Sequence, residues 1–109
     1  MSESANSTYF DEIKSWLTTR CTTTDKRELA IEDLISLGVN EEDRERLLAS
    51  TDKRWIEKRW NPFISQLQTG DELWRFNSPE ITWKNLMGRR GYAILRDGKV
   101  VAWLFTMMS

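Results

Sequence analysis

The first two thirds of the chain have the apolar periodicity of α-helices. Apolar residues recur three or four positions apart in four successive stretches, and capping or helix-ending residues separate these stretches. The run Thr18–Thr23 has weak helix propensity and is expected to end the first helix. Pro62 interrupts the last stretch, so we expect a kink or break there, with helices near 52–60 and 62–68. The pattern therefore predicts four or five helices over residues 9–68.

Three helix boundaries carry local signals. Thr24 or Asp25 can cap the second helix, and Glu28, three positions after Asp25, fits a start of the capping-box type. Gly38 suits the left-handed position that closes this helix. Asn40 is the expected cap of the next helix, which we place at about 41–49 and expect to be half exposed.

The residues from Asp71 onward have a different pattern. The expected order is a strand over 72–76, a short helix from Pro79 to Gly88, and two strands over 91–96 and 99–107. Trp83, Leu86 and Met87 share one face of the short helix. Asp97-Gly98 is a strong hairpin signal, because both residues of a tight turn need positive φ. This part predicts a small three-stranded antiparallel sheet, and the whole chain an α+β fold.

A chain of 109 residues is enough for one domain, and we expect a single domain over 1–109. Within it, 1–8 are expected to be disordered, 9–68 to form the helical part, and 71–109 to form the strand–helix–hairpin part. Residues 1–8 lack the apolar run of a signal peptide, and no stretch approaches the length of a membrane-spanning helix. We therefore expect a cytoplasmic protein without membrane association.

The terminal hairpin is apolar on both faces. Its two-residue turn predicts a register that places Ile94 opposite Val101 and Tyr92 opposite Trp103. A sheet with one face in water usually alternates apolar and polar residues, so either helices of the same chain cover both faces or one face meets a partner. The candidate protein interface is the more aromatic face, formed by Tyr92, Ile94, Val101, Trp103 and Phe105. A homodimer built on the hairpin is compatible with this interface.

The side chains of most catalytic and zinc sites are missing from the sequence. It contains no histidine, which is the usual general base near neutral pH and the commonest metal ligand. Its single cysteine, Cys21, cannot form a disulfide within the chain or a zinc site. We therefore predict no catalytic, metal-binding or cofactor-binding residues, and a protein that is not an enzyme.

The net charge of −1 conceals an asymmetry along the chain. Residues 1–52 contain 6 Lys/Arg and 12 Asp/Glu, whereas residues 53–109 contain 10 and 5, so the two parts carry −6 and +5. The basic part supplies six candidate contacts for an anion or nucleic acid: Lys53, Arg54, Lys58, Arg59, Arg89 and Arg90. The alternative is structural: the first four form the solvated side of an amphipathic helix, and the arginine pair follows the end of another helix.

The C-terminal part resembles a group of small bacterial proteins. The shared pattern covers about 40 residues and consists of GDELWxF at 70–76, SP at 78–79 and GRxGYxxxRxGxV at 88–100. The resemblance implies a bacterial or bacteriophage origin and assigns no role to any residue. The missing histidines, the hairpin that is apolar on both faces, the six tryptophans and the charge asymmetry favour a non-catalytic protein-binding module, such as an inhibitor, an immunity protein or an antitoxin-like protein. Nucleic-acid binding through the basic part is the alternative.

Overall fold

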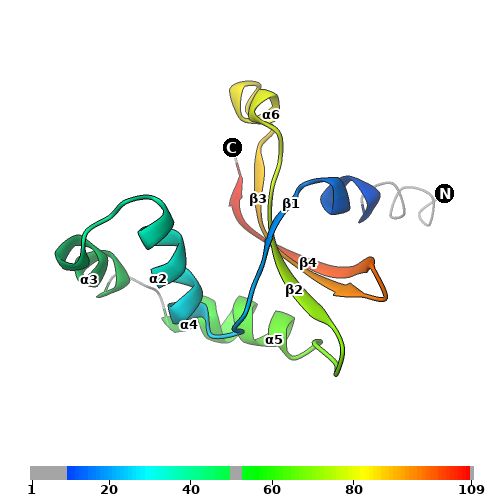
Figure 1. Ribbon diagram of the computed structural model, residues 1–109, viewed down its shortest axis with the longest axis horizontal. Helices are drawn as coiled ribbons and strands as arrows, with labels where there is room; N and C mark the ends of the chain where they lie inside the picture. Colours follow the sequence, from blue (N-terminus) through cyan, green and yellow to red (C-terminus); the bar gives the residue numbers. More distant parts are fainter. Residues whose placement is uncertain (1–9, 50–52, 109) are drawn as a thin grey trace. The chain divides into compact units, whose positions relative to one another are not determined.

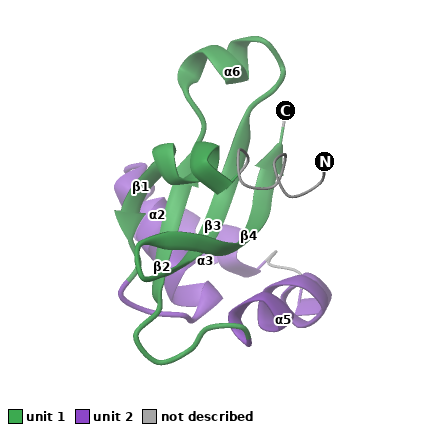
Figure 2. Cartoon of the chain, turned by 90° about the vertical axis from the view of Figure 1, so that its right-hand side faces the viewer, with its two compact units in different colours: residues 1–21, 66–109 green, residues 22–65 purple. Residues whose placement is uncertain are grey.

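The computed structural model describes residues 10–49 and 53–108. The chain divides into two compact units, residues 1–21 with 66–109 and residues 22–65 (Figure 2). We call them the sheet unit and the helical unit and describe each by itself. The expected disorder of residues 1–8 lies outside the described residues, and the single domain remains a prediction.

The sheet unit contains a four-stranded antiparallel sheet in the order β1-β2-β3-β4 (Figure 1). Its strands are β1 (Leu17–Arg20), β2 (Glu72–Asn77), β3 (Arg89–Arg96) and β4 (Lys99–Met108). Residues 10–15 form a helix before β1, and α6 (Glu80–Lys84) connects β2 to β3. The predicted three-stranded sheet is therefore wrong, and the helices do not all precede the strands.

The additional strand β1 comes from the threonine run that was expected only to end a helix. Leu17 pairs with Phe76 and Arg20 pairs with Trp74 of β2. Thr18 and Thr19 are β-branched, so they fit a pleated strand better than a helix. The low helix propensity of this run was recognised, but its strand propensity was not.

The hairpin of β3 and β4 has the predicted turn and a different register. Asp97 and Gly98 both have positive φ, of 54° and 78°, and Arg96 pairs with Lys99. Beyond Leu95 and Val100 the pairing shifts, so that Ile94 lies opposite Ala102 rather than Val101. Val101 is the extra residue of a β-bulge, which moves Ala102–Phe105 of β4 to the other face of the predicted hairpin.

A hydrophobic cluster packs on one face of the sheet. Its buried members are Ile13, Phe76, Ala93, Leu95 and Val100. Partly buried aromatic rings extend it through three ring pairs: Phe10 with Trp103, Trp16 with Phe76, and Phe76 with Phe105. Ile13 belongs to the helix at 10–15, which therefore packs its apolar stripe on one face of the sheet.

The loop that enters β2 is fixed to the end of β3 by an ion pair. The Nε and Nη2 atoms of Arg96 donate to the two carboxylate oxygens of Asp71 at 3.0 and 2.8 Å, and the backbone N–H of Gln68 donates to the same side chain at 2.9 Å. The hydrogen bonds from Arg96 and then from Gln68 lower the pKa of Asp71. Because this carboxylate is already paired, it is a structural group of the hairpin.

The described residues of the helical unit form five helical segments. They are α2 (Lys26–Ser36), α3 (Glu41–Ala49), α4 (Lys53–Trp55), the π-helical turn η1 (Ile56–Trp60) and α5 (Asn61–Ile64). Two predicted caps are confirmed, since Asp25 accepts from the backbone N–H of Glu28 at 3.0 Å and Asn40 accepts from that of Asp43 at 2.8 Å. None of the described helices is long and apolar enough to span a membrane.

Helical structure runs without interruption through Pro62, so of the kink or break that we expected there, the break is wrong. The backbone N–H of Asn61 bonds to the carbonyl of Ile56, five residues earlier, which widens the turn that precedes the proline. Pro62 has no N–H to donate, and it occupies the second position of α5, where a helix tolerates it. Helical structure ends at Ile64, earlier than the expected residue 68.

Candidate functional site

The connection between β2 and β3 projects from one end of the sheet (Figure 1). Ser78 closes its base and is buried. The backbone N–H of Ser78 donates to the carbonyl of Arg89 at 2.9 Å, and the backbone N–H of Arg89 donates to Ser78 Oγ at 2.8 Å. The same hydroxyl lies 2.6 Å from Thr82 Oγ1 in α6. These bonds attach the short helix to the start of β3.

Trp83 connects α6 to the end of β2 and to the backbone before β3. Its Nε1 atom donates to Asn77 Oδ1 at 2.8 Å, and its ring lies directly on the backbone of Gly88. A Cβ atom at position 88 would be only 2.1 Å from the ring, so the close approach requires glycine. Gly88 therefore serves packing against Trp83 and is not the residue that closes α6.

Leu86 occupies the closing position of α6. Its N–H bonds to the carbonyl of Trp83 at 3.2 Å, and the N–H of Met87 bonds to the carbonyl of Thr82 at 2.7 Å, which is the hydrogen-bond pair of a Schellman motif. The motif needs a left-handed residue, and Leu86 has φ of 60°. Glycine is usual there, because a side chain in this conformation costs about 1 kcal/mol or more.

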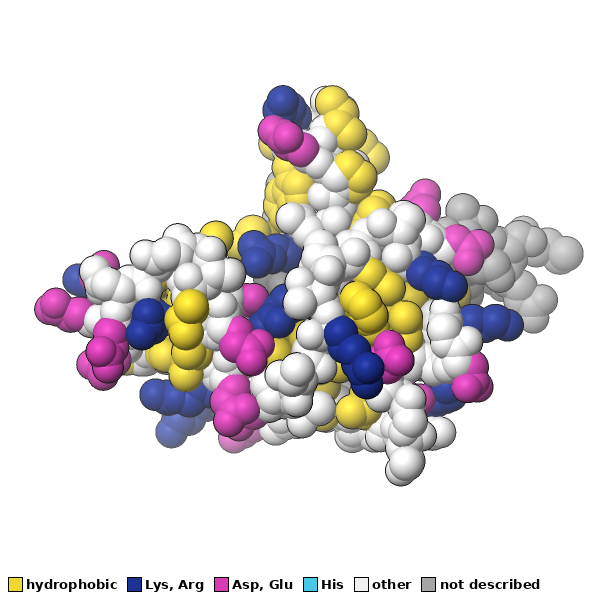
Figure 3. Space-filling model, viewed as in Figure 1, with side chains coloured by type: hydrophobic (Ala, Val, Ile, Leu, Met, Phe, Trp, Pro, Cys, Tyr) yellow, Lys and Arg dark blue, Asp and Glu magenta, His cyan; other side chains and the backbone are white. Residues whose placement is uncertain are grey.

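The projection carries three exposed apolar side chains, which we call the apolar tip: Ile81, Leu86 and Met87. Their exposed fractions are 61%, 76% and 66%. Figure 3 shows hydrophobic side chains over much of this projection. Single exposed apolar residues are common on protein surfaces, but a group of them marks an interaction site. The expectation that Leu86 and Met87 share a helix face with Trp83 is wrong, because α6 ends at Lys84 and its periodicity does not extend to them.

Charged residues lie close to the apolar tip along the chain. Glu80 and Lys84 form an exposed ion pair of 3.6 Å along α6. Arg89 follows the tip at the start of β3, where its Nη1 atom donates to the carbonyl of Gly88 at 2.8 Å and its guanidinium lies 6.0 Å from the ring centre of Phe105. A polar and basic rim around an apolar centre is the usual composition of a protein-binding surface.

The five residues of the predicted interface do not share one face of the sheet. Tyr92 and Ile94 are buried and pair with Leu104 and Ala102, whereas Trp103 and Phe105 pack against the core cluster on the other face. Val101 is exposed at the bulge. The bulge divides the predicted interface residues between the two faces, because it changes which residues of β4 lie on the same face as Tyr92 and Ile94.

The six candidate anion contacts belong to different units. Lys53, Arg54, Lys58 and Arg59 are exposed on α4 and η1 of the helical unit, as the amphipathic reading predicts. Arg89 and Arg90 are half-buried at the start of β3 in the sheet unit. Four of the six are therefore exposed on one helical segment, and the other two begin β3 after the apolar tip.

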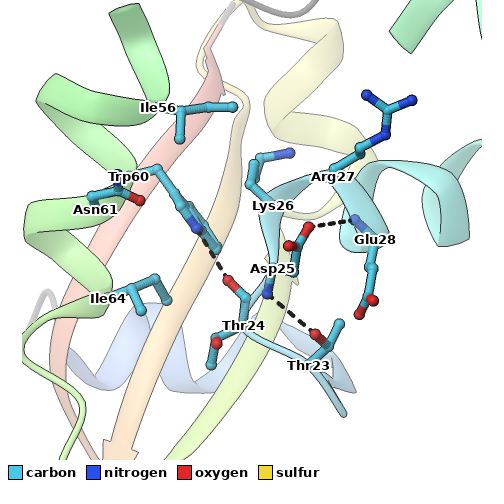
Figure 4. A pocket seen from close by; sticks show the side chains of 10 residues that line it. All are labelled: Thr23, Thr24, Asp25, Lys26, Arg27, Glu28, Ile56, Trp60, Asn61 and Ile64. Atoms are coloured by element: carbon cyan, nitrogen blue, oxygen red, sulfur yellow. Dashed lines mark hydrogen bonds between the residues drawn. The ribbon is translucent and has the colours of Figure 1, made fainter. Parts of the chain in front are cut away.

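A groove of about 520 Å³ opens in the helical unit between the start of α2 and the segment η1–α5 (Figure 4). Trp60 lines it and donates from Nε1 to the carbonyl of Thr24 at 3.2 Å, while the Lys26 ammonium lies 5.8 Å from its ring centre. Asp25 already accepts a hydrogen bond from the N-terminus of α2. The polar groups named here bond to one another, so the groove is a structural feature of this unit.

Within residues 10–49 and 53–108, no cluster of three or more potential ligands is arranged to hold a metal ion. Comparison of the chain with protein-family models, curated proteins and solved structures finds no match. The apolar tip is therefore assigned from its own geometry. A sequence signal for it exists in retrospect: an apolar residue, rather than glycine, follows Asn85 at the end of a short helix.

Proposed function

We propose that this chain is a non-catalytic protein-binding module that contacts its partner through the apolar tip. The observation that carries the proposal is Leu86, whose side chain is 76% exposed on a backbone of positive φ. An exposed leucine gains nothing for folding and leaves the cost of its conformation uncompensated. Strained residues of this kind concentrate where a protein meets a ligand.

The physical properties of the tip suit binding. Burying a leucine or methionine side chain contributes roughly 1.5–3 kcal/mol, and methionine adapts to irregular pockets. Ser78 and Trp83 hold the tip through hydrogen bonds to neighbouring strands, so little conformational entropy is lost on binding.

An inhibitor, immunity or antitoxin-like role is a more specific form of this proposal. The bacterial origin, the cytoplasmic location and the absence of enzymatic activity remain predictions. Nucleic-acid binding also remains a prediction. Its support is the group of four exposed cations on α4 and η1, for which the amphipathic helix is a sufficient reason.

Site-specific photo-crosslinking in the native cell tests the proposal. A photoreactive amino acid at Met87 should give one discrete protein adduct, and adding Leu86→Asp should remove it. The matched control carries the photoreactive residue at Leu47, an exposed apolar position on α3, and should not give this adduct. The same adducts from both positions, or no adduct from Met87, would contradict the proposed function.

A further inference from the structure

The two edges of the sheet differ in length and polarity. β1 forms one edge with four residues, of which Thr18 and Thr19 are polar and Arg20 is charged. Proteins commonly protect edges in this way, because a short or charged strand does not pair readily with another chain.

The opposite edge, β4, has ten residues and a single charge. That charge is Lys99, the first residue, and the nine residues after it are uncharged and include no proline. Val101, Met107 and Met108 are exposed, and no described strand pairs with the outer side of β4. A long, apolar edge of this kind is a template for strand addition.

We propose that β4 pairs with β4 of a second copy of this chain, in antiparallel orientation, to form a continuous eight-stranded sheet. An edge strand that pairs antiparallel with its own copy uses the same surface on both partners and closes as a two-fold dimer. This orientation places the two Lys99 side chains at opposite ends of the interface, so that uncharged residues face uncharged residues along β4. The inference uses a surface other than the apolar tip and stands independently of the proposed function.

The bulges in β4 define where the two copies meet. Val101 and Thr106 are the residues skipped in the pairing with β3, and Ala102–Phe105 between them pair regularly. Bulges disturb a ladder, so the intermolecular hydrogen bonds should centre on this regular segment. A slip of one residue would bring Trp103 of one copy beside side chains of the opposite face, which disfavours registers displaced by one residue.

Sedimentation equilibrium of the full chain at micromolar concentrations tests this dimer. The wild-type chain should have twice the mass of one chain. The double variant Val101→Lys, Thr106→Lys introduces charges at two exposed positions and should weaken the dimer about tenfold or more. The control Leu47→Lys adds a charge on an exposed position of α3 and should leave the dimer unchanged. A wild-type chain that stays monomeric, or equal weakening by both changes, would overturn the inference.

Hydrogen exchange of the wild-type chain gives a second readout that does not depend on a variant. Raising the protein concentration should slow exchange in Ala102–Phe105 and leave Leu17–Arg20 unchanged. Exchange in 102–105 that does not depend on concentration counts against the dimer. The variant Leu86→Asp separates the two proposals, because it should lose the crosslinked partner and keep the dimer mass.

Discussion

The helices α2 and α6 end in the same backbone motif with different residues at its central position. At α2 the N–H of Gly38 bonds to the carbonyl of Ile35, and that of Val39 bonds to Leu34, both at 3.0 Å. At α6 the equivalent bonds start from Leu86 and Met87. Gly38 has φ of 79° and Leu86 has φ of 60°, so both residues are left-handed.

The residue at the end of α2 is the one that local stability favours, whereas the residue at the end of α6 is not. A Cβ atom at Gly38 would have no neighbour within 4 Å, so glycine is present there for its backbone freedom rather than for space. Leu86 adopts the same left-handed conformation with its conformational strain, and its side chain is exposed to solvent. Because nothing in folding offsets that cost, the comparison supports a binding role for the end of α6.

The largest loss of stability is expected from Gly88→Ala, which disturbs the packing of Trp83 beneath the end of α6. The added methyl group would overlap the ring of Trp83, so the ring must move and its bond to Asn77 should break. Overpacking of this kind costs roughly 1–3 kcal/mol. Urea denaturation should show a lower free energy of unfolding, and the photo-crosslink from Met87 should weaken.

A second substitution checks the cause of this effect. Trp83→Leu should destabilise by itself but make Gly88→Ala nearly neutral, because the smaller side chain leaves room for the methyl group. Additive losses in the double variant would show that Gly88 acts through something other than the ring of Trp83.

The comparison also explains which helix ends the sequence could predict. At α2 the cap Asp25 and the closing residue Gly38 are the residue types that the local backbone favours, so both boundaries follow from the sequence. At α6 the closing residue opposes that preference, and Gly88, which the sequence pointed to, serves packing instead. Rules based on local backbone preference therefore predict the ends of α2 but not the end of α6, where the closing residue goes against that preference.

The parts of the sheet that depend on neighbouring residues could be predicted from the sequence. The hairpin turn follows from Asp97-Gly98, because positive φ is a property of those two residues. The bulge at Val101 has no such signal, since it depends on how β4 packs across the whole sheet, and the interface prediction failed with it. The threonines of β1 favour a strand, but its partner β2 lies more than 50 positions away, so no local signal shows that this run joins the sheet.

An intermediate loss of stability is expected from Gly38→Leu, which gives α2 the same closing residue as α6. The left-handed leucine should lower the free energy of unfolding by about 1 kcal/mol, with no added clash because the surrounding space is open. Urea denaturation followed by circular dichroism measures this change. An unchanged stability would mean that leucine is tolerated at a Schellman motif without cost, and the argument from Leu86 would lose its basis.

The smallest effect on stability, and the most informative, is expected from Leu86→Gly. Relief of the left-handed strain should raise the free energy of unfolding, but the greater freedom of glycine in the unfolded chain cancels part of the gain, leaving about 0.5 kcal/mol. The same change should abolish the protein adduct at Met87, because it removes the most exposed side chain of the tip. Leu86→Ala is the matched control: it keeps the strain, so it should lose the adduct without gaining stability. Opposite signs for stability and binding in the glycine variant would show that Leu86 serves binding, whereas a glycine variant that loses both would assign Leu86 to the fold.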